Sequence, residues 1–197
     1  AAAETVFTDV GSVKAPICAL AQELDIEARF VGAHPLAGGT SSGAAAADPS
    51  LFEEGTVLLC PSGDWQQSAY DRVAAMWKAL GARPVETTPG EHDRQVAVTS
   101  HLPQVLSSAL ALTLERTNDV DVSLAGRALD DMTRVAASET EMWRQICRAN
   151  KDEIIVALNR FATALDELRG AVTDGDDEQL GRMFDQARRL SETIGRR

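Results

Sequence analysis

The sequence contains three histidines, His34, His92 and His101, and histidine is the side chain whose charge changes nearest to neutral pH. Three histidines suggest a zinc site, but on one straight helix the spacing of His92 and His101 directs their side chains to opposite sides. The sequence therefore predicts no metal site. His34 follows an expected strand and precedes a glycine-rich turn, where loops often carry active sites. We take His34 as a candidate base, although loop backbone could also satisfy it.

Two further polar side chains could act in such a site. Ser12 follows an expected strand in the string D-V-G-S-V-K, where it could act on a substrate or cap the next helix. Arg134 could bind a carboxylate, or it could form an ordinary surface pair with Asp130 or Asp131 on the preceding helical turn. Neither residue alone decides between these alternatives.

The usual nucleophile and phosphate motifs are absent from the sequence. No cysteine stands in a recognisable turn or helix-start context, so no Cys-His pair is predicted. Neither G-x-G-x-x-G nor G-x-x-x-x-G-K-[ST] occurs, so these residues contain no usual loop for a pyrophosphate. His92 and Trp143 are ambiguous, because each could begin a helix or fill a core.

Composition excludes several classes of partner. The formal charge of −11 repels phosphate backbones, and no basic stripe with interleaved aromatics offsets it, so nucleic acid is not expected. No apolar run approaches the roughly 18 to 20 residues that cross a bilayer, and no signal peptide is evident, so no membrane partner is expected. The odd number of cysteines, 3, favours a reducing compartment and predicts a cytoplasmic protein.

The candidate residues must be positioned by two kinds of structure. Across residues 1–90, short β-branched runs near residues 5, 30, 57 and 84 flank a helix predicted over residues 65–80, which indicates an α/β layer. Across residues 91–197 the β signals cease and an all-α part is predicted. There Leu102, Leu106, Leu110 and Leu114 recur as on a buried helical face, and Pro103 should begin or kink that helix.

Two long helices are predicted near the C-terminus. The capping box from Ser138 to Glu141 should begin one that ends at Gly170 and is roughly 45 Å long, longer than a small domain is wide. A last helix from about Asp176 carries a narrow apolar seam from Leu180 to Ile194. One subunit is too small to cover both apolar faces, so a homodimer is predicted.

Taken together, nine strings resemble the prephenate and arogenate dehydrogenase family, in order from about Val6 to Trp143. These motifs are specific to that family, and their combination outweighs the structural alternatives for each single residue. The strings are D-V-G-S-V-K, F-V-G-A-H-P-L-A-G, Ser42-Gly43, Leu51-Phe-Glu53, Leu59-Cys-Pro61, Glu91-His-Asp93, Ser100-His-Leu-Pro103, Thr133-Arg-Val-Ala-Ala-Ser138 and Met142-Trp143.

The resemblance implies a Rossmann domain followed by a helical domain through which two subunits intertwine. The sequence would then begin at the rear of the Rossmann domain, without its first βαβ unit, and these residues alone would be inactive. The full enzyme implied oxidises prephenate or arogenate. Hydride passes from ring C4 to NAD or NADP, and the ring carboxylate departs as CO2.

The resemblance also implies roles for individual residues. His34 matches the catalytic histidine that takes the C4 hydroxyl proton, as a base tuned near neutral pH. Ser12 matches a serine near this hydroxyl and the nicotinamide, and Pro35 is assigned to the cofactor side. Arg134 matches an arginine that binds a substrate carboxylate, with Asp131 orienting it. The remaining positions, assigned to the substrate pocket and the shell behind it, are His92, His101, Gln104 and Trp143.

Gln104 departs from the family pattern, since some relatives carry a histidine there, and this leaves recognition of the substrate side chain open. Two alternatives to this enzyme remain. One is a catalytically silent helical dimerisation fragment, which would have no need of Ser12, His34 and Arg134. The other is a hydroxyacid-type NAD(P) dehydrogenase, a group that commonly uses a lysine base and lacks the H-P-L-A-G string.

Overall fold

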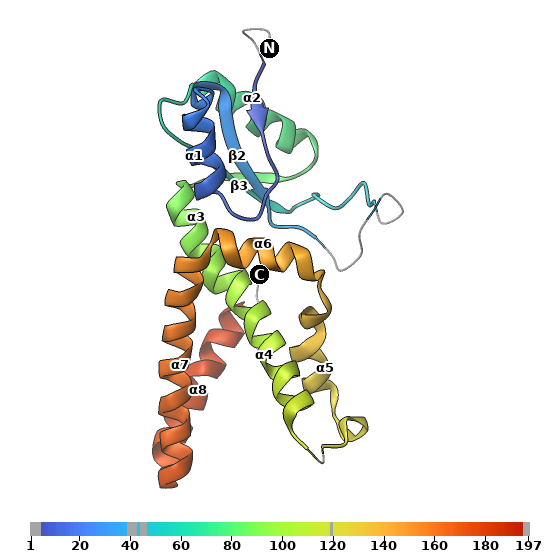
Figure 1. Ribbon diagram of the computed structural model, residues 1–197, viewed down its shortest axis with the longest axis vertical. Helices are drawn as coiled ribbons and strands as arrows, with labels where there is room; N and C mark the ends of the chain where they lie inside the picture. The colour runs from blue at the N-terminus through green and yellow to red at the C-terminus, as the bar shows by residue number, and fades with distance from the viewer. Residues whose placement is uncertain (1–4, 39–42, 44–46, 119, 195–197) are drawn as a thin grey trace. The chain divides into compact units, whose positions relative to one another are not determined.

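The structure is a computed structural model that describes residues 5–38, 43, 47–118 and 120–194 (Figure 1). Ser42, which belongs to one of the family-like strings, lies outside the described residues. The chain divides into two compact units, unit 1 at Ala1–Ile154 and unit 2 at Ile155–Arg197, and each is described by itself.

A four-stranded sheet lies in unit 1, with β1 (Phe7–Thr8), β2 (Phe30–Pro35), β3 (Thr56–Pro61) and β4 (Arg83–Glu86) in that spatial order. The strands lie where the β-branched runs predicted them. β1 and β2 pair in parallel, β2 and β3 antiparallel, and β3 and β4 in parallel. The α/β part of the predicted fold class is thereby confirmed, and the sheet is mixed.

Two helices cover opposite faces of this sheet, α1 (Ala15–Glu23) and α2 (Gln67–Ala79) (Figure 1). Successive side chains of a strand point to opposite faces, so each strand contributes to two cores. The α2 side contains the larger core. Its buried members are Val31, Ala33, Val57, Leu59, Ala69, Val73, Ala74, Trp77 and Ala82.

The α1 side of the sheet is packed closely at β2. Phe30 belongs to the core on this side, together with Cys18 of α1 and Cys60 of β3. Gly32 lies on the same face, and a Cβ built there would be 3.0 Å from the sulfur of Cys18 and 3.2 Å from the backbone oxygen of Cys60. Only glycine allows α1 to approach so closely. His34 is the next residue on this face, which directs it to the α1 side.

One continuous helical path follows the sheet, made of α3 (Pro89–Val96), η3 (Ala97–His101) and α4 (Leu102–Arg116). Pro103, which was predicted to begin or kink a helix, lies in the first turn of α4, where this path changes from π-helix to α-helix. The middle segment η3 is a π-helix, which turns less per residue than an α-helix. This change breaks the straight-helix geometry that the sequence argument assumed for His92 and His101.

The leucine face predicted on α4 is only half-buried. Its buried side chains are Gln104 and Ser107, and they face the segment that follows. That segment contains the remaining helical elements of unit 1. They are η4 (Val122–Leu124), α5 (Arg127–Thr133), η5 (Arg134–Ala137) and α6 (Thr140–Ala149).

Ser138 was predicted to cap the next helix, and this is wrong, because Glu139 is the capping residue. The carboxylate of Glu139 accepts from the backbone N–H groups of Glu141 and Met142 and caps α6, while the Ser138 hydroxyl donates to the carbonyl of Val135 at 2.7 Å. The single long helix is wrong as well, because the backbone leaves helical geometry at Asn150, with φ −114° and ψ 32°.

Most of α7 (Lys151–Asp174) and all of α8 (Asp177–Ile194) belong to unit 2. The helix stop predicted at Gly170 is wrong, since α7 continues to Asp174 and ends at Gly175, which has a φ of +65°. Asp176 N–H then bonds back to the carbonyl of Ala171 at 3.0 Å, as in a Schellman motif. The all-α part of the fold class is confirmed, and no described helix is long and apolar enough to span a membrane.

Candidate active site

His34 lies near the carboxyl end of β2, beside the point where the chain leaves β1. β1 and β2 run in parallel, so their carboxyl ends meet at the same edge of the sheet. The loop after β1 carries Asp9 and Ser12, and β2 ends with His34 and Pro35. The fold therefore gathers the catalytic and cofactor residues that were predicted in this region.

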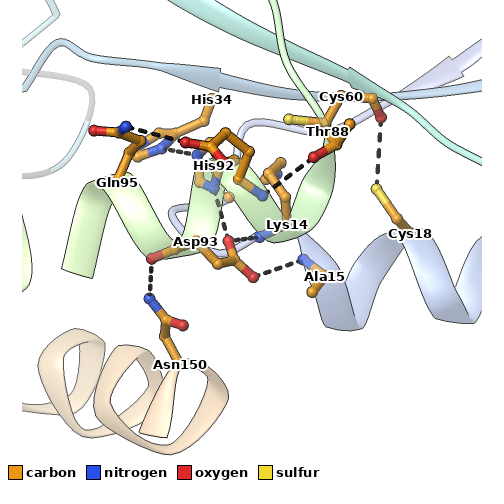
Figure 2. A network of polar contacts seen from close by, with 12 residues as sticks. Lys14, Ala15, Cys18, His34, Cys60, Thr88, His92, Asp93, Gln95 and Asn150 are labelled. Carbon is orange, nitrogen blue, oxygen red and sulfur yellow. Dashed lines mark hydrogen bonds and ion pairs between the residues drawn. The ribbon is translucent and has the colours of Figure 1, made fainter. Parts of the chain in front are cut away.

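A chain of hydrogen bonds runs from His34 into the interior of unit 1 (Figure 2). Nδ1 of His34 lies 2.8 Å from Nε2 of His92, and Nδ1 of His92 lies 2.7 Å from Oδ1 of Asp93. His92 is fully buried, so it cannot form an accessible pocket wall in this unit and instead lies behind His34. We call these three side chains the histidine relay.

The relay can fix the position of the proton on His34. The carboxylate of Asp93 can only accept, so Nδ1 of His92 carries a proton. In the neutral state of His92, Nε2 is then bare and accepts from Nδ1–H of His34. The remaining nitrogen of His34, Nε2, keeps its lone pair and can take a proton from another molecule.

Asp93 also holds the start of α1. Its Oδ1 accepts from the backbone N–H of Lys14 at 2.7 Å, and its Oδ2 accepts from that of Ala15 at 2.8 Å. A carboxylate at a helix N-terminus is favoured by the helix dipole as well as by these bonds. Burial alone would raise the pKa of Asp93, but the bonds from His92, Lys14 and Ala15 together hold this pKa below its ordinary value.

A buried lysine closes the loop between β1 and α1. The ammonium of Lys14 is fully buried, forms an ion pair with Asp9 and donates to the carbonyl of Ala33 at 2.9 Å. Asp9 also accepts from the backbone N–H of Ala33 at 2.9 Å and from that of Gly11 at 2.8 Å. This loop carries Ser12, which is half-buried, and the side chain of Ser12 does not cap α1. The capping alternative for Ser12 is therefore wrong.

The environment of His34 keeps its imidazole neutral. Burial and, to a smaller extent, the nearby His92, Lys14 and His101 lower the pKa of His34 to about 4, while the carboxylate of Asp9 acts weakly in the opposite direction. The sequence-based expectation of a base tuned near neutral pH is therefore wrong for this structure. His34 is unprotonated across the physiological range, in the form that a general base requires.

A second buried histidine lies beside the relay. His101 is 1% exposed, and its Nδ1 lies 3.2 Å from Nδ2 of Asn150, which also donates to the backbone carbonyl of Asp93 at 2.8 Å. The ring of Trp143 meets that of His101 edge to face, with centroids 5.9 Å apart. The indole N–H of Trp143 is buried without a partner among the described residues. The structure thus brings His92 into contact with His34, and Trp143 into contact with His101 beside the relay.

The other predicted substrate residues lie along α4 and the segments that pack on it. Gln104 follows His101 by one helical turn, and its side-chain Oε1 lies 3.4 Å from the hydroxyl oxygen of Ser138. Ser107 accepts from the backbone N–H of Ala136 at 3.1 Å, which holds η5 against α4. Arg134 begins η5 and is exposed.

Arg134 makes no ion pair in the described part of the chain, neither with Asp130 nor with Asp131. The surface-pair alternative is therefore wrong here, and the guanidinium is available to an outside anion. The orienting role predicted for Asp131, which is also exposed, has no supporting contact.

Four residues of this site had no role in the sequence analysis: Asp9, Lys14, Asp93 and Asn150. Asp9 and Lys14 lie inside the D-V-G-S-V-K string, and Asp93 follows His92 directly, so the family-like strings contained a signal for them. Asn150 belongs to none of the family-like strings. Its contact with the site depends on the break between α6 and α7, which the sequence did not predict. Among the described residues, no group of three or more His, Cys, Asp or Glu side chains is arranged to hold a metal ion.

Comparison with known proteins places both parts of the chain in one family. Residues 2–86 match the family model described as prephenate dehydrogenase, nucleotide-binding domain. Residues 88–186 match the model described as prephenate dehydrogenase, dimerization domain.

Individual relatives agree with the family models. The chain is 34% identical to prephenate dehydrogenase from Bacillus subtilis over 189 residues, which is 94% of this chain and 51% of that protein. The chain therefore spans about half the length of this curated relative.

Solved structures give the same fold. The crystal structure of prephenate dehydrogenase from Aquifex aeolicus with hydroxyphenyl propionate and NAD+ has a TM-score of 0.90 and 30% identity, covering 97% of this chain and 68% of that chain. Synechocystis arogenate dehydrogenase has a TM-score of 0.85 and 27% identity, covering 96% of this chain and 69% of that one.

Proposed function

Because the chain belongs to the prephenate dehydrogenase family, we propose that it forms the catalytic base and the substrate site of an enzyme that oxidises prephenate or arogenate with NAD or NADP. The observation that carries this proposal is the histidine relay, which leaves Nε2 of His34 bare and able to accept a proton at the carboxyl edge of β1 and β2. A purely structural dimerisation fragment has no use for a buried relay of this kind.

His34 acts as the general base. Nε2 takes the proton of the substrate C4 hydroxyl as the C4 hydrogen leaves as hydride, so that no high-energy alkoxide or cation accumulates. The ring then loses its carboxylate as CO2, and the electron pair of the broken C–C bond restores aromaticity. The resulting phenol oxygen recovers a proton, and His34 is again neutral.

A bound nicotinamide supplies the hydride acceptor in this chemistry. The residues present fit the nicotinamide end of such a cofactor, because Ser12 lies in the loop after β1 and Pro35 ends β2, at the edge where nucleotides bind in α/β sheets. The pair formed by Lys14 and Asp9 holds the Ser12 loop in place. The sequence contains no glycine-rich phosphate loop, so we expect these residues alone to bind a dinucleotide weakly and to be inactive.

Arg134 binds a carboxylate of the substrate. Its exposed guanidinium lacks an ion pair within the described chain, and a planar guanidinium can hold a carboxylate through two parallel hydrogen bonds. We assign Trp143 and Gln104 to the pocket wall, His92 to orientation of His34, and the buried His101 to the shell behind the pocket. We keep Asp131 as the residue proposed to orient Arg134, because it lies three positions before it in the sequence.

We propose that the protein is a homodimer. Support comes from the match of residues 88–186 to a dimerization domain and from exposed apolar side chains in unit 2. The most exposed of these side chains are Leu165, Val172, Phe184, Leu190 and Ile194, whose relative exposures range from 52% to 66%.

We also keep the boundary between residues 90 and 91 as a proposed division into nucleotide-binding and helical domains. The last described strand ends at Glu86, and the two family models adjoin between residues 86 and 88.

The function is tested in a protein that carries these residues together with a nucleotide phosphate-binding segment. Prephenate and arogenate are each supplied with NAD and with NADP, and reduced nucleotide and CO2 are measured together. We expect both products in equal amounts with at least one substrate. Reduction without CO2 release would indicate a hydroxyacid-type dehydrogenase, and no turnover with any pair would refute the proposal.

A further inference from the structure

Asn150 occupies the break between α6 and α7 and is buried, with 4% of its surface exposed. Because the backbone leaves helical geometry there, its side chain points back toward α3 and η3 rather than along a helix surface (Figure 2). It contacts two partners there, the backbone carbonyl of Asp93 and the ring of His101. Nothing in the proposed reaction yet uses this residue.

The orientation of the Asn150 amide follows from its first partner. A backbone carbonyl oxygen can only accept, so the atom 2.8 Å from the oxygen of Asp93 must be the amide nitrogen, Nδ2. The same Nδ2 lies 3.2 Å from Nδ1 of His101. An amide nitrogen has two hydrogens and no acceptor lone pair, so Nδ1 of His101 must be bare and accept the second hydrogen.

The proton of neutral His101 must then lie on its other nitrogen. Burial lowers the pKa of His101 to about 4, with His92 lowering it and Asp93 raising it, so the ring is neutral at physiological pH. A neutral imidazole carries one proton, and with Nδ1 bare this proton is on Nε2. His34 has the opposite arrangement, because its Nδ1–H faces His92.

We propose that Asn150 is a positioning residue that holds His101 in the Nε2–H form, so that Nε2 is bare on His34 and protonated on His101. His101 is 1% exposed, so it lies behind the accessible part of the site, and with its proton on Nε2 that nitrogen cannot serve as a second base beside His34. The role beside His34 rests on the proposed function, whereas the tautomer can be measured without turnover.

The bond from Asn150 to Asp93 gives the same residue a second effect. Asp93 is the carboxylate end of the histidine relay, and its backbone carbonyl is held by Asn150. One amide therefore determines both the tautomer of His101 and the anchoring of the relay that orients His34.

Nuclear magnetic resonance of the 197-residue chain with 15N-labelled histidine tests the proposal, because the sequence has only three histidines. Long-range proton–nitrogen spectra distinguish a bare imidazole nitrogen from a protonated one, and loss of signals in His101→Gln assigns His101. We expect Nε2–H with bare Nδ1 for His101, and Nδ1–H for His34 and His92. Protonation of Nδ1 in His101 of the unaltered chain at neutral pH would overturn the proposal.

Asn150→Asp is the decisive variant, because it preserves shape while replacing a donor by a group that only accepts. We expect the signal of bare Nδ1 in His101 to disappear as that nitrogen becomes protonated. Asn159→Asp is the matched control, since it makes the same change at an exposed position of α7 and should leave His101 unaltered. An unchanged His101 in folded Asn150→Asp would contradict the proposal.

If Asn150→Asp does not fold, the spectrum of the unaltered chain still decides between the two tautomers. The measurement requires neither substrate nor nucleotide. A wrong tautomer would therefore leave the proposed dehydrogenase function standing, and failure of the enzyme assay would leave the tautomer assignment standing.

Discussion

At the level of single residues, the hydrogen-bond partner of each histidine determines which ring nitrogen is bare and which carries the proton. His34 and His101 are both buried enough for their pKa values to fall to about 4, yet they expose different nitrogens. The difference arises because His34 faces an acceptor on His92, whereas His101 faces a donor on Asn150. Arg134 differs from both in being exposed and without an ion pair among the described residues.

His34→Asn tests the base in the nucleotide-competent enzyme. Asparagine keeps a polar side chain of similar reach but cannot take the C4 proton, so kcat should fall by roughly two to four orders of magnitude while KM changes little. Because the pKa of His34 is about 4, the rising limb of kcat against pH should lie well below the ordinary histidine range. Steady-state kinetics measure both effects, within the pH range in which circular dichroism shows that both enzymes stay folded. Survival of that limb in His34→Asn would identify another group as the base.

Arg134→Gln tests the carboxylate contact. The lost interaction is made in the ground state and the transition state alike, so KM should rise by the equivalent of about 2 to 4 kcal/mol, with a smaller effect on kcat. Arg127→Gln is the control, because Arg127 is also an exposed arginine of the preceding helix and should leave KM unchanged. Equal effects of the two substitutions would mean that general surface charge, rather than Arg134, attracts the substrate.

At the level of elements, helix ends and breaks determine where side chains can reach. The start of α1 is held by Asp93 from a different helix, which fixes the loop that carries Ser12. The break between α6 and α7 directs the side chain of Asn150 toward Asp93 and His101. The π-helical segment η3 changes the direction of His101 relative to His92. Each of these features connects segments that are distant in the sequence.

Two glycine substitutions in unit 2 should change stability in opposite directions. Gly175→Ala places a Cβ at a φ of +65° and should destabilise the helical turn by about 1 kcal/mol. Gly170→Ala lies inside α7 with no atom within 4 Å of the new Cβ, and should stabilise by about 0.5 to 1 kcal/mol. Thermal unfolding of both variants measures the difference. Stabilisation by Gly175→Ala would show that α7 ends elsewhere.

At the level of the whole molecule, buried neutral histidines make stability depend on pH. The pKa of His101 is about 4 in the folded chain and roughly 6.5 when unfolded, so the unfolded chain binds more protons between these values. The contribution of His101 to the free energy of unfolding is therefore fully present above about pH 6.5 and is lost as pH falls toward 4. His34 acts in the same direction, and the lowered pKa of Asp93 adds a further loss in acid.

We expect His101 alone to cost about 3 kcal/mol of stability between pH 7 and 4, measured by urea unfolding at several pH values. His101→Gln should be less stable at pH 7 but should show a flatter dependence on pH. An equally steep dependence in this variant would mean that His101 is already charged in the folded chain.

Assembly is the second property of the whole molecule. Light scattering at low micromolar concentration should give about twice the chain mass of 21.1 kDa. Charging the exposed apolar side chains of α8 in Phe184→Asp with Leu190→Glu should shift the mass to that of a monomer. Leu124→Glu, at an exposed leucine of unit 1, should leave the mass unchanged. A monomer from the unaltered chain would refute the homodimer.

The sequence by itself determined the strands, the change to helices near residue 90, and His34 at the end of a strand. These features depend on local alternation of side chains and on turn residues, which act over a few positions. The family-like strings also contained Asp9, Lys14 and Asp93, although without their roles.

Only the tertiary structure decided the relay, the helix break at Asn150 and the neutral state of His34. Asp93 reaches Lys14 across 79 positions of sequence, and Asn150 reaches Asp93 across 57. Local patterns contain no information about such distances. The pKa of His34 depends on burial and on neighbours from other segments, so no spacing rule could have predicted its fall to about 4. A motif can name a catalytic histidine, but the folded interior determines which of its nitrogens is free to act.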